Sequence, residues 1–273
     1  MMLLQFPFAL SALALCLLLT GVLSFFGYHV VRRGVIFVDL ALAQVASLGA
    51  CFGITMGLGE THPAENFALS LAFTLLGALL FSWFRGRRAL PIEALIGVTY
   101  AGAMALSLIV LEKSATGSEE LKEMLVGSIL TVSPQTLAWA AGLFVVVSAI
   151  LFLSRKPLFQ ITERPDEAKA QGRRIWLWDF LFYTAFGVIV TFSVRVAGVL
   201  LVFAFLIVPS LASILSVGGT WRRVAFGWGF GTAGCLIGLE ASLRLDWSAG
   251  PTIVASFILL LIGAGVVAKL RGR

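Results

Sequence analysis

Nine apolar segments, each about 20 residues long, constrain the fold of this chain more than any other feature. An α-helix needs about 20 predominantly apolar residues to cross the hydrocarbon core of a bilayer. Charged residues make up only 12% of the 273 residues, about half the share of a soluble domain. We therefore predict an all-α polytopic membrane protein, a single transmembrane domain over residues 1–273. The segments are 6–28, 35–58, 67–84, 92–111, 137–154, 177–194, 198–217, 224–242 and 250–268.

Basic residues cluster after every second apolar segment, whereas the alternate connections are acidic or mixed. Such alternation places the basic connections in the cytoplasm and predicts an N-terminus outside and a C-terminus inside. It also explains the net charge of +6 without nucleic acid as a partner. Segments 177–194 and 198–217 are separated only by residues 195–197, so a bundle of either eight or nine helices remains open.

Two connections carry recognisable helix signals. In the stretch 121–137, which predicts a surface or re-entrant helix, Ser133 is an N-cap candidate and Pro134 is suited to open the next span. In the polar stretch 154–176, residues 164–172 predict a short helix, with Pro165 in its first turn and Gly172 at its end. Asp166 and Glu167 suit the positive end of the helix dipole. This short helix is either a docking element for a soluble partner or an ordinary solvated loop.

The second apolar segment contains polar residues where hydrocarbon is expected. A helix turns by about 100° per residue, so Gln44, Ser47 and Cys51 share one face, and Asp39 lies about 140° from Gln44. A polar group inside a membrane marks a transport path or a packing pair. Asp39 either pairs with Arg32 or Arg33 or belongs to a path. Gln44 either forms an interhelical hydrogen bond or lines that path.

Other acidic residues stand near segment ends. Glu93 is placed to stabilise the dipole at the start of segment 92–111. Glu240 and Asp246 flank Arg244 and predict an interfacial charge cluster. The chain contains no GxSxG, HExxH or phosphate-binding loop, so we expect neither an enzyme nor a permanently bound cofactor.

Residues 195–214, "RVAGVLLVFAFLIVPSLASI", resemble the signature of bacterial metal-ion ABC transporter permeases of the ABC-3 type. Gly198, Leu201 and Pro209 stand in signature positions, and Gly250 lies in the similar stretch "SLRLDWSAGPTIV". Four further stretches resemble the family in the expected order, so the resemblance covers nearly the whole chain. They are "RRGVIFVDLALAQVASLG", "LIGVTYAGAMALSL", "LVGSIL" and "DEAKAQG".

The resemblance implies a homodimeric permease of type II-like architecture in the bacterial inner (plasma) membrane. It implies a cytoplasmic ABC ATPase dimer that binds the ATP, an extracytoplasmic metal-binding protein, and a divalent metal as cargo. Zinc is the metal we expect, with manganese or iron as alternatives. The coupling segment would lie at about 155–175. Its residues would be Pro165, Asp166, Glu167, Ala168 and Gly172, and the metal path would draw on Asp39, Gln44, Ser47, Cys51, Glu93 and Glu240.

The second segment departs from the family pattern. Family members carry D-A-x-x-H there, whereas alignment on Gly49 places Gln44 at the histidine, Leu40 at the aspartate, and Asp39 one residue away. An amide oxygen is a harder and weaker ligand than imidazole. Two alternative functions remain: the permease of a cobalamin or siderophore importer, and a secondary transporter that works without an ATPase.

Overall fold

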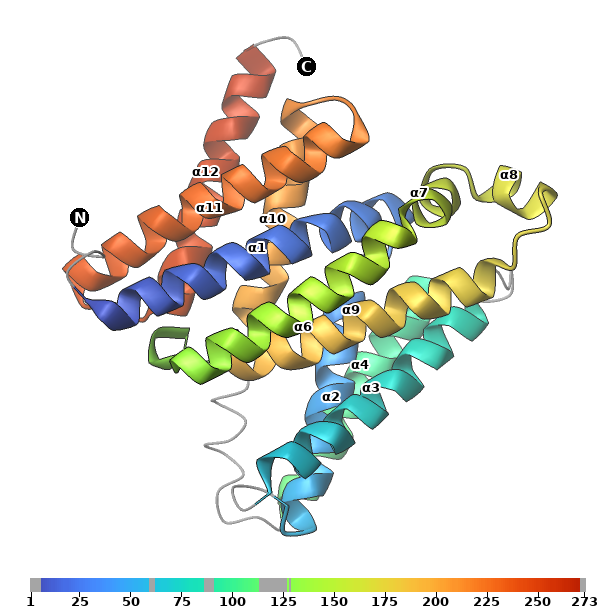
Figure 1. The fold of residues 1–273 in the computed structure, drawn as a ribbon, viewed down its shortest axis with the longest axis horizontal. Coiled ribbons are helices and arrows are strands. Elements are labelled where there is room, and N and C mark those ends of the chain that lie inside the picture. Colours follow the sequence, from blue (N-terminus) through green and yellow to red (C-terminus); the bar gives the residue numbers. More distant parts are fainter. Residues whose placement is uncertain (1–5, 59–61, 86–90, 113–126, 128, 271–273) are drawn as a thin grey trace. The chain divides into compact units, whose positions relative to one another are not determined.

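The computed structural model describes residues 6–58, 62–85, 91–112, 127 and 129–270. Within them the chain forms eleven α-helices and one short 3₁₀ turn, and no strand (Figure 1). The elements are α1 (Pro7–Arg33), α2 (Val38–Thr55), α3 (Pro63–Phe84), α4 (Ile92–Leu111), η2 (Ile129–Thr131), α6 (Pro134–Leu153), α7 (Arg155–Glu163), α8 (Pro165–Ala170), α9 (Ile175–Ala197), α10 (Val199–Ser216), α11 (Thr220–Leu245) and α12 (Ala249–Leu270).

Nine of the helices in the described residues are long and apolar enough to cross a membrane. They coincide with the nine predicted segments, which confirms the fold class. The choice between eight and nine is decided at Gly198, which has φ 79° and ψ 155° between the end of α9 and the start of α10. This conformation is open almost only to glycine, so α9 and α10 are two helices.

Local sequence signals set several helix boundaries. α6 begins at Pro134, and the backbone N–H of Thr136 donates to Ser133 Oγ over 3.1 Å, so the predicted N-cap is confirmed. α3 likewise begins at a proline, Pro63. Proline suits this place because the first N–H groups of a helix have no partner within it. Of the predicted helix in 121–137, residues 121–126 and 128 lie outside the described part.

The chain divides into two compact units, each assembled from distant parts of the sequence. One unit comprises residues 32–124 and 147–194, and so contains α2, α3, α4, α7, α8 and most of α9. In it, α2 packs against both α3 and α4. Gly49 of α2 lies so close to Ser70 of α3 that an added Cβ would be 2.9 Å from the Ser70 Cα. Thr74 of α3 and Thr191 of α9 are hydrogen-bonded at 2.9 Å.

The other unit comprises residues 1–31, 125–146 and 195–273. α10 packs there against α11 and α12, which also contact each other. The rings of Phe205 and Phe257 meet at 5.4 Å, and Ser256 Oγ donates to the carbonyl of Gly234 over 2.6 Å. Because both units combine segments distant in sequence, the division does not cut the chain into consecutive domains. The prediction of a single domain stays a prediction.

Apolar side chains also face outward on the long helices. Leu259, Ile262 and Leu270 of α12 are 70%, 59% and 82% exposed. Apolar side chains are compatible with lipid, whereas backbone polar groups must be satisfied within the helix. This outer surface suits the lipid bilayer that the sequence predicts as the surroundings.

Candidate functional site

The four polar or thiol side chains predicted to line a path in α2 are all buried. Asp39 is 2% exposed, Gln44 and Ser47 are each 6% exposed, and Cys51 is fully covered. Gln44 and Asp39 occupy different faces of the helix, but contacts with both α3 and α4 leave little of α2 uncovered. The structure therefore places the predicted donors inside the protein, without gathering them at one point.

Asp39 does not form the ion pair expected from the sequence. Arg32 Nη2 donates instead to Glu163 over 2.8 Å, and Arg33 Nη1 donates to Asp179 over 2.9 Å. Asp39 Oδ1 has no hydrogen-bond partner among the described residues. The expectation of a structural pair with Arg32 or Arg33 is thus wrong. The tertiary packing directs both arginines to other carboxylates, and a buried carboxylate oxygen of Asp39 stays available.

A further polar oxygen, on α3, lies against the C-terminal half of α2. Asn66 is 6% exposed, and its Oδ1 has no hydrogen-bond partner among the residues described. An added Cβ on Gly53 of α2 would collide with this oxygen. In the sequence, Asn66 stands in the acidic connection just before segment 67–84, so it was not predicted as a site residue. Only the packing of α3 on α2 shows that it faces inward.

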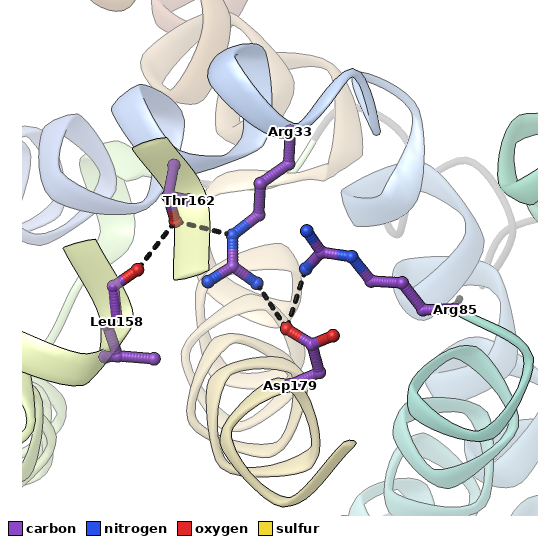
Figure 2. A network of polar contacts seen from close by, with 5 residues as sticks. All are labelled: Arg33, Arg85, Leu158, Thr162 and Asp179. Atoms are coloured by element: carbon purple, nitrogen blue, oxygen red, sulfur yellow. Dashed lines mark hydrogen bonds and ion pairs between the residues drawn. The ribbon is translucent and has the colours of Figure 1, made fainter. Parts of the chain in front are cut away.

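A buried cluster of charges joins the ends of four helices (Figure 2). Arg33 ends α1, Arg85 follows α3, and Asp179 lies in the second turn of α9. Arg33 Nη1 and Arg85 Nη1 both donate to Asp179 Oδ1, over 2.9 and 2.7 Å. The side chains of Arg33 and Asp179 are completely covered, and that of Arg85 is 18% exposed.

The fourth helix of the cluster is α7, through Thr162. Arg33 Nε donates to Thr162 Oγ1 over 2.8 Å, and the same hydroxyl donates to the carbonyl of Leu158 over 2.8 Å. The Arg33 guanidinium also lies over the Phe182 ring, 4.2 Å from its centre. Figure 2 shows Arg33 between Thr162 on one side and Asp179 on the other. Arg33 is therefore held at both ends of its guanidinium.

The short helix predicted in the polar connection is present as α8. Pro165 is its first residue, Asp166 and Glu167 lie in its first turn, and Ala168 is buried. Gly172, with φ 71°, follows the end of the helix. The N–H groups of Gly172 and Arg173 bond the carbonyls of Lys169 and Ala168, which is the Schellman arrangement. The predicted helix and its closing glycine are confirmed as structure.

α7 was not predicted as a helix. Its nine residues bury Leu158, Ile161 and Thr162, which recur at the three- and four-residue spacing of one helix face. Gln160 Nε2 of α7 donates to Gln171 Oε1 just after α8 over 2.7 Å. The polar connection is thus an ordered pair of short helices.

Two of the acidic residues near other segment ends, Glu93 and Glu240, have local explanations. Glu93 is exposed in the first turn of α4, where it favours the helix dipole. Glu240 Oε1 accepts from Arg244 over 2.8 Å one helical turn away. No group of three or more His, Cys, Asp or Glu that could hold a metal occurs in the part of the chain that the structure describes. A metal on α2 would therefore also need amide, hydroxyl or backbone oxygens.

Sequence reasoning missed the charge cluster, although one signal for it was present. Asp179 is an acidic residue at the start of an apolar segment, on the side where the connections are basic. A carboxylate in such a place requires a basic partner. The sequence offers several arginines at that side, and nothing local selects Arg33 and Arg85 among them.

Nine long apolar helices in the described residues, with a pair of short helices in one basic connection, define a multi-pass helical membrane protein. Residues 5–268 match the ABC 3 transport family, and the chain belongs to this family.

Two of the known relatives, a manganese permease protein and a zinc uptake membrane protein, align over nearly their full length. The chain is 24% identical over 269 residues to the manganese import system permease protein ScaB of Streptococcus parasanguinis, covering 98% of this chain and 93% of that protein. It is 23% identical over 266 residues to the high-affinity zinc uptake system membrane protein ZnuB of Haemophilus influenzae, covering 94% and 95%. Among solved structures, PsaBC from Streptococcus pneumoniae in complex with Fab matches with a TM-score of 0.81 at 21% identity, over 98% of this chain and 97% of that one.

The residues that carried the sequence resemblance lie at packing positions. Gly198 separates α9 from α10, Leu201 is 1% exposed, and Gly250 is buried in the first turn of α12. Pro209 lies inside α10, and its ring faces Gly231 of α11. These residues shape the bundle, and none of them offers a side-chain ligand.

Proposed function

We propose that this chain is the membrane-spanning permease subunit of an ATP-driven importer for divalent metal ions in the bacterial plasma membrane. The observation that carries the proposal is the family match over residues 5–268, together with relatives aligned end to end. Manganese, zinc and iron all occur in the names of those relatives. A metal-chelate permease and an ATP-independent transporter are the alternatives that the experiment below addresses.

The metal path in this proposal follows α2. Asp39 supplies a buried carboxylate with a free oxygen near the first turn, and Gln44 and Ser47 supply oxygens further along the helix. Five residues advance a helix by about 7.5 Å, so Asp39 and Gln44 would act as successive contacts instead of one cage. Weak, successive contacts suit a path, because the ion must leave as well as enter. Glu93 and Glu240 are explained by local contacts and are weaker candidates.

The donor chemistry of α2 bears on the cargo. Carboxylate and amide oxygens suit manganese, whereas imidazole and thiolate suit zinc. Gln44 stands where the family has histidine, and Cys51 is the one soft donor on that face. Zinc, the metal predicted from the sequence, stays a prediction, and the oxygen donors favour manganese over it.

The energy source in this proposal is a separate ATPase pair. Its docking element would be α8, with Pro165, Asp166, Glu167, Ala168 and Gly172, carried by α7. An external metal-binding protein would deliver the ion, and a second copy of the chain would complete the pathway. The ordered ends of α8 support this role, because a partner can push only on an element that keeps its shape.

Growth and cellular metal content in the native host test the proposal. We expect deletion of the chain to lower one of manganese, zinc and iron selectively, and that metal to restore growth. Gln44→Ala should lower its uptake, whereas Gln135→Ala, an exposed amide at the start of α6, should not. If none of the three metals changes on deletion, the proposal fails and a chelate importer becomes the better reading. If metal uptake persists after the partner ATPase activity is removed, the chain acts as a secondary transporter instead.

A further inference from the structure

Two adjacent arginines at the end of α1 form hydrogen bonds with the last turn of α7. Arg32 bonds Glu163 over 2.8 Å at the surface, and Arg33 bonds Thr162 over 2.8 Å inside. Both acceptors belong to the last turn of α7. A displacement of α7 must therefore either break these bonds or move the end of α1.

α7 and α8 are themselves joined closely. Only Arg164 separates them, and the Gln160–Gln171 hydrogen bond of 2.7 Å spans the junction. Leu158, Ile161 and Ala168 are completely buried. A force applied to α8 therefore reaches Thr162 through a short, ordered piece of chain.

Beyond Arg33 the contacts continue to two further helices. Asp179 of α9 accepts from Arg33 and from Arg85, the residue that follows α3, through the same oxygen. Asp179 Oδ2 and Arg33 Nη2 are both buried without a hydrogen-bond partner among the described residues. The cluster therefore has an unused acceptor and an unused donor. Arg33 can shift from a single to a paired bond with Asp179 without exposing a charge.

We propose that Arg33, Thr162, Asp179 and Arg85 form a coupling latch that passes the movement of α7 and α8 to the ends of α1, α3 and α9. In this proposal the four residues act as positioning residues, through the helices that they join and not through contact with the metal or ATP. The proposal rests on the proposed function, in which α8 receives the force of an ATPase. The spare donor and acceptor in this buried cluster would let Arg33 and Asp179 adopt a second bonding arrangement, as a relay between two states requires.

Thr162→Val in the complete transporter tests the latch. The variant keeps the shape of the side chain and removes only the hydroxyl that accepts from Arg33. Thr99→Val is the matched control, because Thr99 Oγ1 also donates to the carbonyl four residues earlier, on α4, and bonds no arginine. The complex, purified from native membranes, is placed in vesicles, and Mn²⁺ uptake and ATP hydrolysis are measured together. Zn²⁺ is substituted if the wild type carries zinc.

We expect Thr162→Val to assemble and hydrolyse ATP as the wild type does. The number of ions carried per ATP should fall about fivefold, which is the lower end of the usual range of allosteric coupling between two sites. Thr99→Val should keep the wild-type ratio. An unchanged ratio in Thr162→Val overturns the latch, as does a fall in uptake matched by an equal fall in hydrolysis or in assembled protein.

Arg33→Lys provides a second variant if Thr162→Val does not assemble. It keeps the positive charge beside Asp179 and removes the Nε–H that bonds Thr162. The same loss of ions per ATP is expected, and failure of both variants to assemble assigns the cluster a purely structural role and overturns the proposal. Absence of uptake by the wild type with Mn²⁺, Zn²⁺ and Fe²⁺ contradicts the proposed function, whereas normal uptake with an unchanged ratio in the variants contradicts the latch alone.

Discussion

Arg33 and Asp179 are 146 positions apart in the chain, yet their side chains meet with no exposed surface, Nη1 to Oδ1, over 2.9 Å. Arg85 reaches the same oxygen over 2.7 Å. One carboxylate thus faces two guanidinium groups in a covered place. The two positive charges tolerate this proximity because Asp179 lies between them.

Asp179→Asn should strongly destabilise the protein. The amide preserves the shape but leaves the buried guanidinium of Arg33 without a counter-charge, which costs about 3 to 5 kcal/mol of unfolding free energy. Glu163→Gln is the control, since the Arg32–Glu163 pair is 44% and 29% exposed, and such pairs contribute about 0 to 1 kcal/mol. Thermal unfolding in detergent compares the two. Equal unfolding temperatures would contradict the importance of the buried charge.

Gly49→Ala should weaken the packing of α2 on α3. The added Cβ would stand 2.9 Å from the Ser70 Cα and 3.0 Å from the Leu69 carbonyl oxygen. Backbone atoms cannot move away by a side-chain rotation, so α2 and α3 must separate. This separation lowers the free energy of unfolding by about 1 to 3 kcal/mol. Gly97→Ala on α4 serves as the comparison, because no atom lies within 4 Å of its added Cβ. Unfolding temperatures in detergent measure both, and a neutral Gly49→Ala would refute the close approach.

Gly198→Ala should destabilise the junction between α9 and α10. Its φ of 79° with ψ of 155° is a conformation that costs a residue with a side chain about 1 to 3 kcal/mol. Gly218→Ala is the matched control. Gly218 precedes α11, has no positive φ, and has no atom within 4 Å of an added Cβ, so this change should have little effect. Protease resistance of the junction and the unfolding temperature are the measurements. If both variants behave as the wild type, the junction does not depend on the glycine conformation.

Gln44→His should shift the cargo preference toward zinc. Imidazole binds zinc better than an amide oxygen does, and a change of about tenfold in the zinc-to-manganese uptake ratio corresponds to about 1.4 kcal/mol. Competition between the two ions in vesicles measures this ratio. Gln135→His places the same imidazole at an exposed site on α6 and should leave the ratio unchanged. If Gln44→His leaves it unchanged as well, the ion does not contact residue 44.

The spans and caps are predictable because local information suffices for them. A window of about 20 residues decides whether a helix can enter lipid. The N-cap of Ser133 and the end of α8 at Gly172 each depend on residues within one turn. α7 was not predicted because most of its residues are polar and only three of them are buried. These three residues indicate a helix only when the neighbouring helices that cover them are known.

The candidate site was predictable as a set of buried polar residues on α2, but its partners were not. The sequence places Asp39 six residues after Arg33, which made an ion pair between them the natural local expectation. Arg33 ends α1 and Asp39 lies in the first turn of α2, and the structure turns the Arg33 guanidinium toward Asp179, in a segment almost 150 positions later. Asn66 likewise acquires its inward position only from the packing of α3 on α2.

By itself, the sequence determined a bundle of eight or nine apolar helices, their principal boundaries and the polar residues within α2, because hydropathy, capping and glycine conformation act over a few residues. Tertiary structure alone decided that Asp179 pairs with two arginines and that one oxygen of Asp39 has no hydrogen-bond partner among the described residues. It also decided that hydrogen bonds join the last turn of α7 to the end of α1. A buried charge pairs with whichever opposite charge the packing brings within about 3 Å, and that choice depends on contacts between segments far apart in the chain.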